Sequence, residues 1–274
     1  MKKIRIIVGK VIKRLNKREK IMVPIMTDSG HLLETHTALI TGGCGGIGSS
    51  IAKRFSDAGC NVIVSGTSLD KVKTMCEQNP KLKGILLDLK DVASFEEKIT
   101  EAEKLFGGGI DILVNCAGFN PETNFFDASE DDFDNTMAVN IKGTFFLSRV
   151  VSNRMIANCT KGHILNISSS SALRPAWSPY EISKWALKGF TIGMADSLIP
   201  HGIVVNGIAP GPTATKMQNR SDESDLDYGN PIGRLQTPDE IANLALVLAS
   251  DMGNIVVGDT LYATGGSGVI SLHN

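Results

Sequence analysis

Short, almost continuously apolar segments alternate with helical patterns from Thr37 onward. Strands that are covered by helices on both faces have this composition, because neither face meets water. The alternation therefore predicts an α/β fold: one doubly wound, parallel, seven-stranded sheet with helices on both faces. The predicted strands are residues 37–41, 61–65, 84–88, 110–115, 163–168, 202–208 and 260–263. The predicted helices lie near residues 47–57, 69–78, 91–105, 129–157, 178–199 and 238–249.

The length of 274 residues suits one such domain, which we expect to span residues 35–274 after a basic extension at 1–34. Residues 1–20 contain nine Lys or Arg residues and one acidic residue, Glu19, although the whole chain has a net charge of −1. Apolar residues recur there at helical spacing. Such a helix suits peripheral contact with an anionic membrane surface, but we favour a solvated extension.

The five cysteines are odd in number and show no metal-ligand spacing, and the five histidines are scattered. This pattern favours a reducing, cytoplasmic location and predicts no metal site. No apolar run approaches the length of about 20 residues that a membrane span needs. The chain after residue 20 has an excess of nine acidic charges, and nucleic acid is not a predicted partner.

A glycine-rich loop, TGGCGGIG, follows the first predicted strand and opens the first helix. Glycine permits positive φ and close approach of the backbone to a pyrophosphate, and the helix N-terminus then offers free N–H donors. The run satisfies both G-x-G-x-x-G and T-G-x-x-x-G-x-G, the latter through Gly42, Gly46 and Gly48. In this strand–turn–helix context it predicts dinucleotide binding.

Tyr180 and Lys184 stand four residues apart near the start of a predicted helix, so their side chains share one face. A phenol with a pKa of about 10 is a poor base at neutral pH, and a nearby ammonium lowers that pKa. The hydroxyl-rich run Ser168–Ser171 precedes them and offers a serine to the same carbonyl oxygen. The pattern predicts proton transfer at a carbonyl or alcohol carbon.

With these motifs, residues 36–268 resemble the short-chain dehydrogenase/reductase family. The matching elements are TGGCGGIG, NCAG (115–118), MAVNIKGTF around Asn140, the NISS run, YEISK and IAPGPTAT (208–215). The resemblance implies that Tyr180 is the general acid or base and that Lys184 lowers its pKa and binds the nicotinamide ribose. It also implies that Asn140 anchors a proton-relaying water. Ser169 aligns with the substrate-binding serine, but it precedes Tyr180 by two residues fewer than usual, so Ser168 and Ser170 remain alternatives.

The resemblance implies further contacts between the chain and the cofactor. These are Gly42, Gly46, Ile47, Gly48, Thr67, Asp88, Leu89, Asn115, Ala117, Gly118, Tyr180, Lys184, Pro210, Gly211, Thr213 and Thr215. The segment after the second strand, Ser65–Ser68, has no carboxylate that would repel a 2′-phosphate, so NADP(H) is favoured over NAD(H). Gly45, however, stands where many NADP-using relatives carry a cation.

The irregular segment near 211–233 is expected to form a substrate lid at the carboxyl ends of the strands. Its polar character favours a ketone or secondary alcohol of a sugar-like or polyol-like substrate. One alternative is 3-oxoacyl-carrier-protein reductase, which the acidic stretch after NCAG disfavours. The alternative from another class is a dinucleotide-binding regulator without turnover. The resemblance also implies a homodimer or homotetramer built from the helices near 129–157 and 178–199.

Overall fold

The computed structural model describes residues 31–215 and 229–271. The basic segment at 1–20 and the middle of the predicted lid lie outside the described residues. Leu33, upstream of the predicted boundary, is fully buried, and its amide donates to the carbonyl of Ala58 at 3.0 Å. The folded core therefore includes Leu33. Within the described part of the chain, no helix combines the length and apolarity required to cross a membrane.

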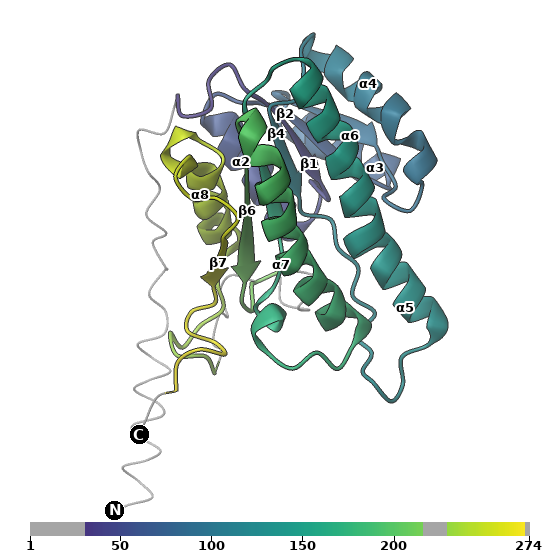
Figure 1. Ribbon diagram of the computed structural model, residues 1–274, viewed down its shortest axis with the longest axis vertical. Coiled ribbons are helices and arrows are strands. Elements are labelled where there is room, and N and C mark those ends of the chain that lie inside the picture. Colours follow the sequence, from purple (N-terminus) through teal and green to yellow (C-terminus); the bar gives the residue numbers. More distant parts are fainter. Residues whose placement is uncertain (1–30, 216–228, 272–274) are drawn as a thin grey trace, which may run out of the picture.

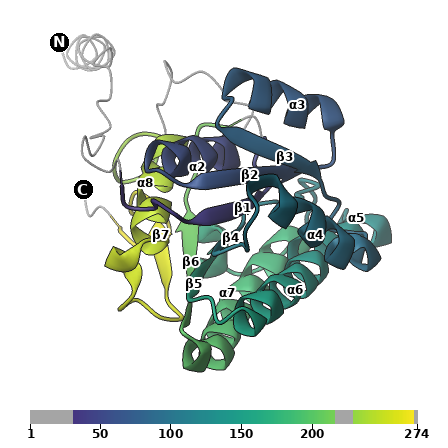
Figure 2. The same cartoon turned by 90° about the horizontal axis from the view of Figure 1, so that it is seen from above.

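Seven parallel strands form one sheet in the order β3-β2-β1-β4-β5-β6-β7 (Figures 1 and 2), which confirms the predicted fold class. The strands are β1 (Thr37–Thr41), β2 (Asn61–Gly66), β3 (Leu82–Leu86), β4 (Ile112–Asn115), β5 (Gly162–Ile167), β6 (Ile203–Pro210) and β7 (Thr260–Ala263). The strand order reverses direction between β1 and β4. Loops that follow these two strands diverge there and leave a crevice at their carboxyl ends.

Helices cover both faces of the sheet (Figure 2). One layer holds α2 (Gly46–Asp57), α3 (Leu69–Gln78) and α8 (Pro238–Leu248); the other holds α4 (Phe95–Phe106), α5 (Glu130–Met137), α6 (Thr144–Ala157) and α7 (Pro179–Leu198). Two apolar cores result. Phe55 of α2 packs with β1 in the first core, and Leu147 of α6 packs with β4 in the second. Both side chains are fully buried.

Capping residues set the start of α7, the helix that carries Tyr180 and Lys184. Ser178 is its N-cap and accepts a hydrogen bond from the amide of Glu181 at 3.3 Å, and Pro179 occupies the first turn. Proline is favoured there because its missing N–H would have no helical partner. Hydrogen bonds from Ser168 Oγ to the Lys184 carbonyl and from Lys184 Nζ to the Ile167 carbonyl hold the start of α7 against the end of β5.

The helix predicted over 129–157 is interrupted by a six-residue π-helix, Ala138–Gly143, between α5 and α6. The wider turn holds Asn140, which is buried. Gly143 ends the turn against the loop after β3, where a Cβ would overlap the carbonyl oxygen of Leu89. π-turns are rare and cluster at functional sites. Uniform helical periodicity in the sequence concealed this interruption.

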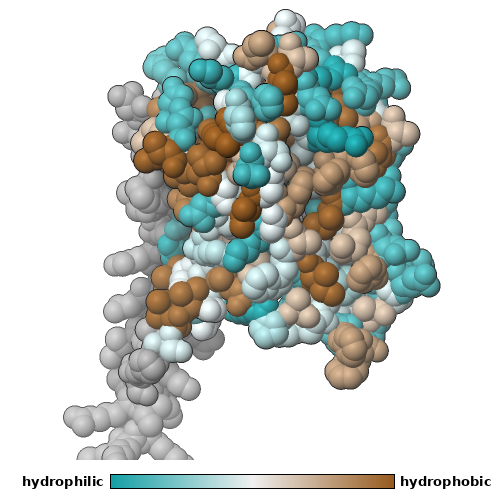
Figure 3. Space-filling model, viewed as in Figure 1, coloured by the Kyte–Doolittle hydropathy of each residue, from teal (hydrophilic) through white to brown (hydrophobic). Residues whose placement is uncertain are grey.

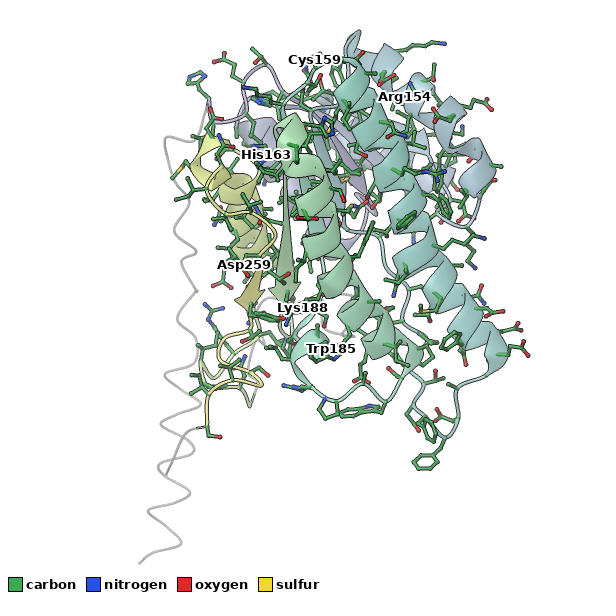
Figure 4. All side chains as sticks on the ribbon, viewed as in Figure 1. Arg154, Cys159, His163, Trp185, Lys188 and Asp259 are labelled. Atoms are coloured by element: carbon green, nitrogen blue, oxygen red, sulfur yellow. The ribbon has the colours of Figure 1, made fainter. Side chains whose placement is uncertain are left out.

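His163 of β5 is a buried, neutral histidine at the amino end of the sheet (Figure 4). Burial is the main cause that lowers its pKa to about 4; His36 acts in the same direction, and Asp251 and the backbone of Leu248 oppose it. The unfolded chain binds this proton near pH 6.5. Between these two values the unfolded state binds more protons, so stability falls as the pH falls.

We therefore expect the free energy of unfolding to drop by about 2 kcal/mol through this residue between pH 7 and pH 4.5. His163→Phe should remove that part of the loss, measured by urea unfolding at both pH values and one protein concentration. His201→Phe, at an exposed histidine, is the control and should keep the full pH dependence. An unchanged pH dependence in His163→Phe would contradict this account.

Candidate active site

The glycine loop between β1 and α2 forms a tight backbone turn at the crevice. Gly42 has φ +63°, and a Cβ there would lie 2.8 Å from the Cα of Ala117. A Cβ at Gly48 would overlap the carbonyl oxygen of Gly42. Gly45 is the N-cap of α2 and supplies no capping side chain, so the first N–H groups of α2 remain available to a ligand. Such a backbone cradle fits a dinucleotide pyrophosphate.

Thr41 ties this loop to the loop after β4. Its Oγ1 accepts the amides of Cys116 and Ala117 at 3.0 and 3.1 Å and approaches the carbonyl of Val114 at 3.4 Å. Gly46 faces the loop after β6, because a Cβ there would lie 2.6 Å from Cγ2 of Thr215. The predicted cofactor segments that follow β1, β4 and β6 thus meet at the carboxyl ends of these strands.

The predicted adenine-side residues lie at the neighbouring strand ends. Thr67 follows β2 and is exposed, and Asp88 is exposed in the loop after β3, where its Oδ1 accepts the amide of Lys90 at 2.9 Å. Leu89 is buried in the second core. The side-chain amide of Asn115 donates to Ser148 and Asn166, both at 2.9 Å. Its side chain joins β4 to α6 and β5 within the interior.

Tyr180 and Lys184 lie together one turn apart on α7, as predicted. The Lys184 Nζ lies 5.4 Å from the centroid of the Tyr180 ring and donates to the carbonyl of Ile167 at 3.0 Å. Lys184 is buried, whereas Tyr180 is partly exposed and lines the cleft. The structure therefore presents the phenol to the cleft and keeps the ammonium behind it.

The electrostatics of this pair differ from the sequence-based expectation of a lowered phenol pKa. Burial is the largest effect on Tyr180 and raises its pKa, a side-chain hydrogen bond with Ser169 lowers it, and the charge of Glu181 raises it. Burial also lowers the pKa of Lys184 to about 8, against a weaker opposing effect of Cys116. In this arrangement Tyr180 is a neutral phenol at pH 7 and can donate a proton.

All three candidate serines line the cleft, and their hydrogen bonds distinguish them. Ser169 forms a side-chain hydrogen bond with Tyr180, and its Oγ donates to Ser171 Oγ at 3.1 Å. The Oγ of Ser168 donates to the carbonyl of Lys184 at 3.2 Å, which commits it to holding α7 against β5. Ser170 begins the short 3₁₀ turn Ser170–Leu173 and is buried. The hydroxyl that meets Tyr180 is that of Ser169.

Asn140 connects the loop after β4 to α7. Its Oδ1 accepts the amide of Phe119 at 2.7 Å, and its Nδ2 donates to the carbonyl of Phe119 and to Ser183 Oγ at 3.0 and 2.9 Å. A Cβ at Gly118 would lie 3.7 Å from both Asn140 Oδ1 and Lys184 Nζ. Asn140 therefore positions the backbone that passes Lys184.

These residues surround a cleft of about 430 Å³. Of the predicted site residues, Ile47, Ser169, Tyr180, Pro210, Gly211, Thr213 and Thr215 line it. Trp177 also lines the cleft. The sequence-based prediction omitted the other lining residues Asn120, Glu122, Thr123, Asn124, Ser171, Arg174, Ser178, Glu181 and Pro212 as contacts. For Arg174 the sequence held one usable signal, because the segment between Ser169 and Tyr180 is too short to leave the site.

Comparison with known proteins extends this picture. A family profile described as short chain dehydrogenase matches residues 36–226. The (2S)-[(R)-hydroxy(phenyl)methyl]succinyl-CoA dehydrogenase subunit BbsD of Thauera aromatica is 35% identical over 242 residues, which are 85% of this chain and 97% of that protein. The 3-oxoacyl-[acyl-carrier-protein] reductase FabG of Aquifex aeolicus is 33% identical over 85% of this chain and 98% of its own.

A similar solved structure is a gluconate 5-dehydrogenase from Burkholderia cenocepacia in complex with NADP and tartrate. It has 31% sequence identity and a TM-score of 0.80, and the alignment covers 89% of this chain and 99% of that chain. The two chains therefore share one fold over most of their lengths.

Proposed function

This chain belongs to the short-chain dehydrogenase/reductase family of NAD(P)-dependent oxidoreductases that act on CH–OH groups, and we propose that its own substrate is a sugar-like or polyol-like ketone or secondary alcohol. The observation that carries the proposal is the meeting of Ser169 and Tyr180 at one wall of a polar cleft, with Lys184 behind them. Ile47, which lies between Gly46 and Gly48 of the glycine cradle, lines the same cleft.

In the proposed mechanism, Ser169 donates a hydrogen bond to the substrate oxygen and Tyr180 donates its proton to that oxygen during carbonyl reduction. The nicotinamide cofactor, when bound, supplies the hydride, or accepts it in the reverse direction. Lys184 stabilises the phenolate that Tyr180 becomes, since its ammonium lies 5.4 Å from the ring centroid. Asn140 acts as a positioning residue that holds the 118–119 backbone beside Lys184.

We propose NADP(H) as the preferred cofactor. Thr67 is exposed at the end of β2, and Ser68 caps α3 by accepting the amide of Lys71 at 3.4 Å. Hydroxyls and a helix N-terminus favour a 2′-phosphate, whereas an NAD enzyme commonly presents a carboxylate to the ribose at this position. The similar gluconate 5-dehydrogenase was solved with NADP, which supports the same choice.

The substrate class follows from the polar lining of the cleft. Serine, asparagine, threonine and carboxylate side chains dominate, with Trp177 the single aromatic side chain besides Tyr180 among the described lining residues. Hydroxyl-rich substrates match such a surface. The similarity to a FabG keeps 3-oxoacyl-carrier-protein reduction as the second candidate. A regulator without turnover is disfavoured, because both proton-transfer residues are in place.

We also propose a homodimer or homotetramer that forms through α6 and α7. Phe145, Trp185 and Ile192 are 42%, 42% and 54% exposed there, and apolar residues reach the surface over these helices (Figure 3). Exposed apolar patches of this kind mark interaction surfaces. A cytoplasmic location is part of the same proposal, supported by five cysteines that are all free.

A substrate screen with both cofactors tests this function. We expect NADPH oxidation with keto sugars, or NADP⁺ reduction with polyols and sugar acids, at a kcat/KM at least about 10-fold above that with NAD(H), a difference of about 1.4 kcal/mol. Acyl-carrier-protein and coenzyme A thioesters of 3-oxo acids form the second arm. Turnover confined to that arm, or no turnover in either arm, would overturn the proposal.

A further inference from the structure

Arg174 is the cationic side chain in the lining of the cleft, among the residues that the structure describes. It follows the 3₁₀ turn Ser170–Leu173, which begins next to Ser169. Ser169, Tyr180 and Arg174 line the same cleft. Arg174 takes no part in the proposed proton transfer.

The orientation of Arg174 is held by hydrogen bonds at both its backbone and its side chain. The backbone amide donates to the carbonyl of Ser171 at 3.2 Å, and the backbone carbonyl accepts Nε1 of Trp185 at 2.8 Å. One guanidinium nitrogen, Nη2, donates to Ser267 Oγ at 2.7 Å. Gly268 lets the chain pass close to Nε, because a Cβ there would lie 3.2 Å from that atom. Such preorganisation reduces the entropy lost on binding.

The charge of Arg174 has no carboxylate partner within ion-pairing distance in the described parts of the chain. Glu181 lines the same cleft, but its Oε2 accepts the amide of Trp177 at 2.8 Å and the hydroxyl of Ser178 at 3.2 Å. Glu122 is exposed at the cleft rim. The guanidinium of Arg174 is therefore oriented by the neutral hydroxyl of Ser267, and it lies in the same cleft as Ser169 and Tyr180.

We propose that Arg174 binds a carboxylate of the substrate, so that the enzyme acts on a sugar acid or another polyhydroxy acid in preference to the neutral polyol. This inference rests on the proposed function and narrows its substrate class. A guanidinium matches a carboxylate through two parallel N–H···O hydrogen bonds. The hydroxyl-rich remainder of the lining then contacts the carbon chain, and Ser169 and Tyr180 contact the reacting oxygen.

The test compares two probes that differ in one charge, gluconate and its uncharged amide, gluconamide. Binding is measured by calorimetry with the NADPH-saturated full-length enzyme, so that no hydride transfer to the cofactor follows. Wild type should bind gluconate at least about 10-fold more tightly than gluconamide, and Arg174→Gln should abolish this difference by weakening gluconate binding about 10- to 100-fold. Arg174→Lys should retain part of the preference.

Arg149→Gln, at an exposed arginine of α6 outside the cleft lining, is the matched control and should bind both probes as wild type does. Melting temperature and NADPH affinity verify that each variant folds. Equal or undetectable binding of the two probes by wild type, or an unchanged preference in Arg174→Gln, would overturn the inference. The proposed function fails separately, when wild type turns over neither sugar acids nor polyols nor their keto forms.

Discussion

Replacing Tyr180 by phenylalanine is expected to lower kcat by about 10²- to 10⁴-fold and to leave the NADPH dissociation constant within about twofold of wild type. The hydroxyl is the group that Ser169 meets in the cleft, and its pKa, raised mainly by burial, keeps it protonated at pH 7. Phenylalanine keeps the ring beside Lys184 and removes only the hydroxyl group that carries the transferable proton. Steady-state kinetics and fluorescence titration of NADPH measure the two quantities.

Tyr262→Phe is the matched control for this substitution. Tyr262 lies on β7, and its ring faces Lys188 at 5.3 Å, outside the cleft lining. It should leave kcat within about twofold of wild type. A Tyr180→Phe enzyme that retains more than about one tenth of wild-type kcat would show that another group transfers the proton.

Gly48→Ala, which adds one methyl group, is expected to weaken NADPH binding by about 100-fold or more. The new Cβ would overlap the Gly42 carbonyl oxygen and lie 3.0 Å from Gly43 Cα, so the backbone of the cradle has to move. A shift of about 1 Å in a preorganised site can cost about 10²-fold. The same fluorescence titration measures this loss, and the melting temperature reports whether the variant folds.

Two further glycines calibrate this experiment. Gly108→Ala meets no atom within 4 Å and should bind NADPH as wild type does. Gly46→Ala approaches only the Thr215 side chain, 2.6 Å from its Cγ2, so it should retain the fold and weaken NADPH binding by a smaller factor. If Gly48→Ala binds NADPH within about threefold of the wild-type affinity, the glycine loop is not part of the cofactor site.

Most of the sheet was predictable because its central strands are covered on both faces. The burial of β5 and β6 is uninterrupted, and an apolar run marks such strands well. The edge strand β3 was displaced, from predicted residues 84–88 to Leu82–Leu86. Exposed and buried residues mix along β3. Exposed Lys83 interrupts the apolar pattern near the start of the strand, and buried Leu87 extends the apolar run beyond its end.

The site was predictable where spacing along one element decides the geometry, as for Tyr180 and Lys184 on α7. It was less predictable where contacts join different elements. The inward amide of Asn115 depends on Ser148 and Asn166, and the raised pKa of Tyr180 depends on burial by the whole cleft wall. The position of Arg174 in the lining depends on how the turn after Ser169 folds.

In the π-helix at Ala138–Gly143, the number of residues determines where the Asn140 side chain lies. A π-turn holds one residue more than an α-turn, so removing one residue would restore ordinary α-helical winding. The wider turn absorbs that residue, so α5 and α6 would keep nearly the same relative orientation, whereas the residues within the turn would move. Asn140 would then leave the position from which it contacts Phe119 and Ser183. We infer that the length of this segment is constrained as tightly as the identities of Asn140 and Gly143.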